Sequence, residues 1–589
     1  MRKISLFVLL LCMTLLDAAQ SGTANQDNAI DKLLREIRDF RTSERKKDSA
    51  ANHPLGSNRE EDFLRRYTFY KSIDTKLKAV DESKLSFDDD INLELLEYEM
   101  EDEVAFYTFK SYLNPILSDE GFHTWLPGLA SGTFTTKKDF ENYIGRLRDM
   151  PRYVQENLDL MRRGLQLGIC QPRSILDGYQ NTYEKQIVDT LEKSVFWKPF
   201  SQKPTSVSDE DWKAIRQEGE KAVREDAVGA FRQIKSFFDN EYLPKTRTTI
   251  GVSNFPDGLA YYQERVQHYT TTNISYDKVY QLGLKEVDRI KKQMFDVLKE
   301  VNFKGSMQEF ITYLRTDPRF YATTPEQLLK EASYIAKQID GKLPMLFGKL
   351  PRQPYGVEPV PEHLAPTYTA GRYSGAPISS KRAGHYWVNT YDLKSRPLYA
   401  LESLTMHEAV PGHHLQIALT QELTNLPEFR RNLYVNAFGE GWGLYSEYLG
   451  EEMGFYKDPY SKFGRLTYEM WRACRLVIDV GLHAKGWTRQ QAVDYLAANT
   501  ALSLHEVNTE INRYISWPGQ ALAYKMGELK IKELRKKAED KLGSKFDVRE
   551  FHDLILSQGT VTLPIMEKMV DRYIESKLAP AKPNVATLR

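Results

Sequence analysis

Apolar side chains recur every three or four positions along most of this chain, with charged side chains between them. The segments from Tyr280 to Val301 and from Pro325 to Leu343 show this spacing. It is typical of amphipathic helices that bury one face against a core. The pattern therefore predicts a mainly α-helical protein.

Residues 349–384 break this pattern. They are rich in proline and glycine and carry little periodicity, which predicts a long irregular connection. The connection leads into residues 385–390, His-Tyr-Trp-Val-Asn-Thr, a run of β-favouring and aromatic side chains. We expect a small β element there, directly before the next helix.

The composition agrees with a soluble globular protein. The 589 residues are 41% hydrophobic and 12% aromatic, which is enough for a sizeable core. Lys plus Arg and Asp plus Glu both total 81, so the net charge does not indicate nucleic acid or an anionic membrane as a partner. No Gly/Ser linker or low-complexity tract divides the chain.

The first residues carry the features of a secretory signal. A basic start precedes an apolar run from Ile4 to Leu16, which is too short to anchor in a bilayer, and small residues follow it. Residues 1–19 are therefore predicted to be a signal peptide, and no second run of membrane length follows. The mature protein would be secreted or held in a secretory lumen or periplasm. Its Cys170 and Cys474 would be either bridged or both buried as thiols.

Residues 407–414 read His-Glu-Ala-Val-Pro-Gly-His-His and form the most informative stretch of the chain. They follow Leu398, Leu401 and Leu404, whose spacing predicts a helix with a buried face. A His-Glu pair on such a helix begins the zinc-peptidase signature, in which two imidazoles bind the metal and the glutamate activates water. The stretch therefore predicts a metal site with Glu408 as its base.

The second histidine stands six or seven positions after His407, whereas the familiar signature places it four positions on. On a regular helix, six residues turn the side chain about 120° away, and seven separate the Cα atoms by about 10.5 Å. Zinc–nitrogen bonds of about 2.0–2.1 Å suit neither arrangement. Pro411 and Gly412 can break the helix and reset its phase, because proline removes a donor and glycine permits unusual dihedrals. We favour His413 as the second ligand, with His414 as the alternative.

A catalytic zinc commonly has three protein ligands and one water. Glu440 stands between two glycines, which permit a close approach of the backbone to a neighbouring helix or metal, and it follows the His-Glu helix by about thirty residues. We therefore predict Glu440 as the third ligand. Glu447 shares its helical face seven residues later and is predicted to orient a ligand from behind.

Two motifs, His-Glu-x-x-Pro-Gly-His-His-x-Gln and Glu-Gly-Trp-x-x-Tyr, resemble those of the family of unknown function number 885. The resemblance runs from about residue 30 to about 580 and includes the stretches 268–272, 384–389, 513–520 and 557–559. That family is similar to the gluzincin metallopeptidases, with angiotensin-converting enzyme and thimet oligopeptidase as distant relatives. The resemblance implies one Zn²⁺ ion, peptide-bond hydrolysis and a mostly helical, two-lobed fold with a deep cleft.

Two lobes would divide the chain at the irregular connection. We place an N-terminal helical lobe at about 25–348, a catalytic zinc-binding lobe at about 349–580, and a tail at 581–589. In the relatives a strand at the position of residues 385–390 pairs with the extended substrate, so the resemblance implies an exposed strand edge here. The expected substrate is a short peptide.

Hydrolysis also needs a donor to the oxyanion that forms when water attacks a carbonyl. In angiotensin-converting enzyme a histidine precedes an Arg-Tyr pair at an interval similar to that between His505 and Arg513-Tyr514 here. By this resemblance Tyr514 is the expected donor, assisted by His505, with Tyr524 as the alternative. Arg513 or Lys525 is expected to hold a substrate carboxylate.

Two other functions stay open at this point. A zinc-dependent hydrolase of a non-standard amide would use the same residues. A non-catalytic secreted protein that binds a ligand in a helical cleft would be expected to have lost Glu408 or a metal ligand, and this chain keeps all of them.

Overall fold

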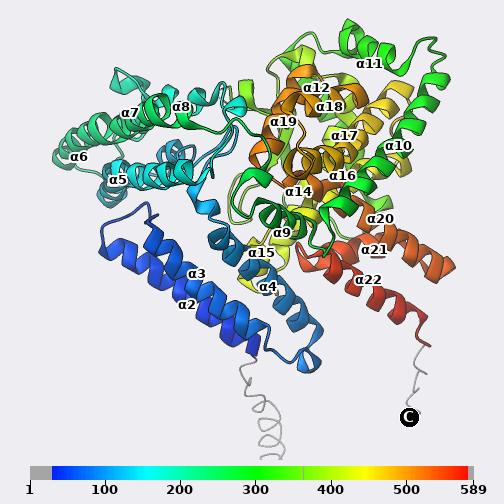
Figure 1. Cartoon of the computed structure of the whole chain (residues 1–589), viewed down its shortest axis with the longest axis horizontal. Helices are drawn as coiled ribbons and strands as arrows, with labels where there is room; N and C mark the ends of the chain where they lie inside the picture. The colour runs from blue at the N-terminus through cyan, green and yellow to red at the C-terminus, as the bar shows by residue number, and fades with distance from the viewer. Residues whose placement is uncertain (1–28, 363, 581–589) are drawn as a thin grey trace, which may run out of the picture.

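The computed structural model describes residues 29–362 and 364–580 and is mainly helical, as predicted (Figure 1). The predicted signal peptide at 1–19 and the tail at 581–589 lie outside the described residues. None of the helices in the described part of the chain combines the length and the apolar character that crossing a bilayer requires.

The first helices form one side of the molecule, where α2, α3 and α5–α7 lie in Figure 1. Apolar residues of α2, α3 and α4, including Ile30, Ile73 and Met100, share a small core. The bounds of this group are α2 Ala29–Ala50, α3 Glu60–Leu77, α4 Phe87–Thr108, α5 Lys137–Leu167, α6 Asp209–Lys221, α7 Val228–Phe237 and α8 Leu243–Lys245.

The next four helices lead to the sheet. They are α9 Gly258–Thr270, α10 Tyr276–Glu300, α11 Met307–Thr316 and α12 Pro325–Asp340. Helices α10 and α12 confirm the two amphipathic segments that the sequence pattern predicts. Gly283 of α10 packs against Leu476 and Val477 of α17 (Pro459–Ala484), a helix that is buried along almost its whole length.

The remaining helices are α13 Leu401–Glu408, α14 His413–Glu422, α15 Glu428–Asn432, α16 Asn436–Glu452, α18 Arg489–Asn499, α19 Leu504–Ser516, α20 Ala523–Leu542, α21 Val548–Ile555 and α22 Leu563–Leu578. Of these, α13, α16, α18, α19 and α20 pack against α17. Both Cys170 and Cys474 are free and buried, so the disulfide alternative does not apply.

A three-stranded sheet stands directly before α13. Its strands are β1 Tyr355–Pro359, β2 Gly371–Ser374 and β3 Gly384–Val388, in the order β1-β3-β2. The small β element is therefore confirmed, but β3 pairs in parallel with β1 and antiparallel with β2. The expectation of an exposed edge at residues 385–390 is wrong, because β3 is the central strand. The edge strands β1 and β2 come from the segment expected to be irregular.

Two hydrophobic cores draw residues from both sides of residue 348. One joins Phe231 and Ile290 to Leu401 and Met470. The other joins residues of α4 and α12 to α13, α16, α20 and α22. The division of the chain into lobes at 348/349 stays a prediction.

Candidate functional site

The helix that carries His407 breaks in front of His413. Helix α13 ends at Glu408, and α14 begins at His413. A Cβ at position 412 would collide with the carbonyl oxygen of His407, so the chain can pass this closely only with Gly412. The predicted break is present, and it sets His413 beside His407 with their ring centroids 4.8 Å apart.

Three side chains of metal-ligand type converge across the break. His407, His413 and Glu440 each offer one ligand atom, and the three atoms lie within 4.8 Å of one another. The Nε2 atoms of His407 and His413 lie 3.7 and 3.5 Å from Oε2 of Glu440. Bonds of about 2.0–2.1 Å place tetrahedral zinc ligands about 3.3 Å apart, so the spacing suits a small cation. We call these three residues the histidine–glutamate cluster.

The glycines around Glu440 explain how α16 comes so close. A Cβ at Gly443 would lie 2.7 Å from Cε1 of His407, so the missing side chain makes room for the imidazole. Gly441 lies directly against Gly527 of α20. Trp442 then donates from Nε1 to the carbonyl oxygen of the proline in the break, at 2.8 Å. The Glu-Gly-Trp motif is thus a packing device that holds α16 against the break.

Glu447 supports the cluster from behind. Its Oε1 lies 2.8 Å from Nδ1 of His407. The other ring nitrogen of His407, Nε2, faces Glu440. Nη2 of Arg472 lies 3.4 Å from the same carboxylate oxygen. A carboxylate on the far nitrogen fixes the tautomer and orientation of a metal-binding imidazole, so Glu447 lies where such a partner is needed.

His414 points elsewhere. Its Nδ1 hydrogen-bonds with the hydroxyl of Tyr373 at 3.0 Å, and its ring lies 4.6 Å from that of Tyr355, centroid to centroid. Burial lowers the pKa of His414 to about 4, so this imidazole is neutral near pH 7. Of the two adjacent histidines, His413 is the one that the structure places with His407 and Glu440.

The electrostatics of the cluster favour positive charge at its centre. Burial opposes protonation of His407, but hydrogen bonds to Glu440 and Glu447 outweigh it and raise the pKa to about 10. Burial likewise works against the Glu440 carboxylate, and the two histidines overcome it and hold its pKa well below the usual range. Zinc binds neutral imidazoles and carboxylates. A bound zinc ion would therefore replace the positive charge that protonated histidines place beside Glu440 in its absence.

Glu408 follows His407 in α13 and contacts the backbone of β2. Its Oε2 accepts a hydrogen bond from the backbone N–H of Tyr373 at 2.8 Å. This N–H therefore points away from β3, so the free edge of β2 faces Glu408. Because N–H and C=O groups alternate between the two edges of a strand, the N–H of Gly375 follows on the same edge. An extended chain lying along β2 would pass directly over Glu408.

The two candidate tyrosines have different surroundings. Tyr514 is 1% exposed, and its hydroxyl accepts from Trp471 Nε1 at 2.7 Å and from Arg475 Nε at 2.8 Å. The ring of Tyr524 lies 6.4 Å from that of His407, and its hydroxyl accepts from Arg513 at 2.9 Å. The role expected for Tyr514 stays a prediction; its hydroxyl is enclosed, and Tyr524 is buried as well, at 7% exposure. Tyr524, the alternative, is the tyrosine beside the cluster.

His505, Lys525 and Arg513 are the other residues for which this region carries a predicted role. His505 is exposed near the start of α19, about 13 Å along the helix axis from Tyr514. In the described part of the chain, no hydrogen bond or ion pair links its imidazole to the cluster. Lys525 is fully buried and pairs with Glu469 at 2.9 Å, so it is not available to a substrate carboxylate. Arg513 is committed to Tyr524 and its neighbours.

Tyr434 is a neighbour of the cluster that sequence reasoning missed. Its hydroxyl donates to Oε1 of Glu440 at 3.4 Å, and its ring is 39% exposed. Gly439 makes room for it, since a Cβ there would collide with the tyrosine ring. The glycine before Glu440 was the only signal of such a contact in the sequence.

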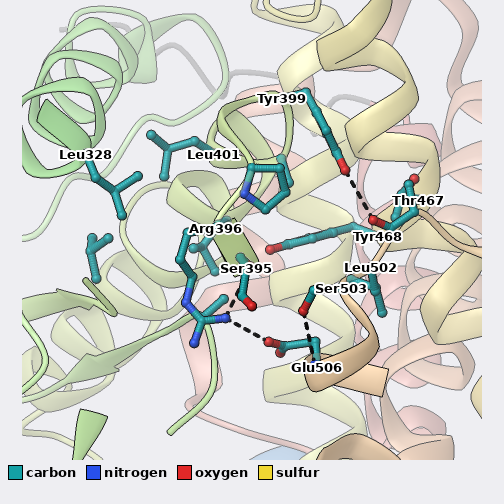
Figure 2. Close-up of a pocket in the computed structure, with 16 residues that line it drawn as sticks. Leu328, Ser395, Arg396, Tyr399, Leu401, Thr467, Tyr468, Leu502, Ser503 and Glu506 are labelled. Carbon is teal, nitrogen blue, oxygen red and sulfur yellow. Dashed lines mark hydrogen bonds and ion pairs between the residues drawn. The ribbon is translucent and has the colours of Figure 1, made fainter. Parts of the chain in front are cut away.

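A small cavity lies beside α13. Figure 2 shows Leu401 of α13 and Leu328 on its wall and the ion pair of Arg396 with Glu506, which measures 3.1 Å. Its volume of about 30 Å³ holds about two water molecules. No residue of the histidine–glutamate cluster lines it, so it is separate from the candidate site.

Comparisons with known proteins agree with the extent of this fold. Residues 41–570 match the family model of bacterial proteins of unknown function, DUF885. The chain belongs to this family. A solved structure from Colwellia psychrerythraea, described as a lipoprotein, superposes with a TM-score of 0.81 at 28% identity, over 88% of this chain and 92% of that one.

A second solved structure, from Shewanella oneidensis and also described as a lipoprotein of unknown function, has a TM-score of 0.63 at 17% identity. It covers 87% of this chain and 92% of its own, and at this identity it shows the fold alone. A comparison with curated proteins finds no match. The two solved structures therefore share the architecture of this chain, and the site must carry the functional argument.

Proposed function

We propose that this DUF885 protein is a zinc-dependent peptidase that hydrolyses short peptides in a cleft between two helical lobes. The observation that carries the proposal is the convergence of His407, His413 and Glu440 across the helix break, with Glu408 beside them at the free edge of β2. The lipoprotein description of two structural relatives supports a place outside the cytoplasm.

The donor set fits zinc in kind and in number: two imidazoles and one carboxylate leave a fourth position open. His407, His413 and Glu440 would hold the ion, and Glu447 would orient His407. When bound, zinc polarises a carbonyl and makes water acidic enough to be a nucleophile near pH 7.

The chain's own residues supply the remaining steps. The free edge of β2 would bind the substrate backbone in an extended conformation. Glu408 would take the proton from the attacking water and deliver it to the departing amine. Tyr524 would donate a hydrogen bond from its hydroxyl to the developing oxyanion, because its oxygen already accepts a hydrogen bond from Arg513 and, among the described residues, its hydrogen is free.

Mass spectrometry of a mixed peptide pool tests this proposal. The wild-type protein and its Glu408→Gln variant would be incubated side by side, with their zinc content measured. We expect cleavage by the wild type and a loss of about 10²- to 10⁴-fold in the variant at equal zinc content. An equally active variant would contradict the assignment of the base. No cleavage by the zinc-loaded wild type would redirect the search to non-standard amides.

A further inference from the structure

A pocket of about 540 Å³ adjoins the histidine–glutamate cluster. This volume lies in the range of sites for small ligands. Its walls come from the loop after β2, from α14 and from the segment that leads into α16. These elements adjoin the site, because β2 contacts Glu408, α14 carries His413, and α16 carries Glu440.

Three residues that line the pocket connect it to the site. Tyr434 lines the pocket and donates to Glu440. Ile417 lines it one helical turn after His413, on the same face of α14. Gly375 lines it two residues after Tyr373, and a Cβ there would lie 3.8 Å from the Ile417 side chain. A peptide extended along β2 would therefore run from Glu408 into this pocket.

Arg431 gives the pocket its charge. It is the one charged side chain among the described residues of the lining, which otherwise holds amides, hydroxyls and apolar groups. Arg431 is exposed, and its guanidinium makes no hydrogen bond or ion pair with any described residue. The adjacent Arg430 is different, since it is buried and donates to Asn92 and Gln558. One arginine of the pair supports the fold, and the other faces the pocket without a partner.

We infer that this pocket binds a carboxylate of the substrate through Arg431. Two residues of extended chain, from Tyr373 to Gly375, span about 7 Å. The pocket therefore begins about two residues along an extended substrate from Glu408, and the carboxylate would lie beyond that point. A free C-terminus and an acidic side chain offer the same group to a guanidinium. This inference rests on the proposed function and names the substrate class of the same site.

Matched peptide pairs test the inference and separate the two sources. One pair differs only in a free or amidated C-terminus, and the other only in Glu or Gln near the cleaved bond. Wild-type kcat/KM is expected to favour the carboxylate form of one pair by about 10- to 100-fold. Arg431→Gln should remove the preference, and Arg431→Glu should reverse it towards a lysine-containing peptide. Arg549→Gln, which changes an exposed arginine on α21 outside the pocket, is the matched control and should keep it.

Calorimetric binding of the same peptides to the Glu408→Gln protein separates this inference from the peptidase proposal. Binding that depends on both the carboxylate and Arg431, without cleavage by the wild type, would support the pocket and contradict the peptidase. Cleavage that is equal for both members of each pair, and unchanged by Arg431→Gln, would overturn the inference and leave the peptidase standing. If no carboxylate peptide is either bound or cleaved, the inference is also overturned.

Discussion

Lys525 and three glutamates form a buried cluster of charges, and so do His407, His413 and Glu440 at the helix break. Nζ of Lys525 lies 2.9 Å from Glu469, 2.9 Å from Glu528 and 3.3 Å from Glu286. We call these four residues the lysine cluster. Two further cations of the chain pair with these carboxylates: Arg465 with Oε2 of Glu469, and Lys532 with Oε1 of Glu528.

Among the described residues, no lysine or arginine pairs with the carboxylate of the histidine–glutamate cluster. Glu440 faces two imidazoles instead, and these carry charge only when they are protonated. Burial works against that charge, yet Glu440 and Glu447 raise the pKa of His407 to about 10. The lysine cluster is thus neutralised by charges that the chain itself supplies. The histidine–glutamate cluster would be neutralised by protons or, under the proposed function, by a metal ion.

Substitution of the lysine should separate stability from metal binding most strongly. Lys525→Met leaves several buried carboxylates without their central cation, so the free energy of unfolding should fall by about 3–5 kcal/mol. Zinc stoichiometry should stay unchanged. Denaturant unfolding of the zinc-loaded protein measures the first, and metal analysis the second. Lys536→Met, which removes an exposed pair with Asp540, should cost at most about 1 kcal/mol. Loss of zinc in Lys525→Met would show that the clusters are not independent.

The tyrosine pair should separate catalysis from packing. Tyr524→Phe removes the expected oxyanion donor and should lower kcat by about 10²- to 10³-fold, with zinc content unchanged. Tyr514→Phe removes an enclosed hydroxyl that two donors share, so it should lower the thermal midpoint more than kcat. Steady-state kinetics and thermal unfolding of both variants make the comparison. The opposite pattern would restore Tyr514 as the donor.

Replacing the supporting carboxylate should have the smallest effect. Glu447→Gln keeps the shape of the side chain but removes its charge from Nδ1 of His407, so zinc affinity should fall by about 10- to 100-fold. Competition with a chelator measures the change. Glu451→Gln, one turn further along α16 and paired with Arg465, serves as the control and should leave the affinity unchanged. Equal affinities in all three proteins would mean that Glu447 only packs.

Local patterns were enough to predict much of this site. The three-residue leucine spacing predicted α13, and Pro411-Gly412 predicted the break after it. Glycines at 439 and 441 indicated the close approach of α16. Each of these features depends on backbone conformation or on a missing side chain, which neighbouring residues determine.

Non-local packing decided the rest. The sequence left His413 and His414 open, because the choice depends on Tyr355 and Tyr373 in strands that the irregular segment concealed. The interval between His505 and Tyr514 favours Tyr514 as the donor, but the turn after α19 brings the ring of Tyr524 close to His407. Strand β3 is central because β1 and β2 pair with its two edges. The residues of β3 alone do not show which strands pair with them.

Zinc titration into the metal-stripped protein tests the central claim most directly. Calorimetry on the wild type, His413→Asn and His414→Asn would compare two adjacent imidazoles with the same substitution, and thermal unfolding would verify that each variant is folded. We predict one zinc ion per chain for the wild type and His414→Asn, and loss of that binding in His413→Asn. No binding by the wild type, or loss only in His414→Asn, would contradict the account.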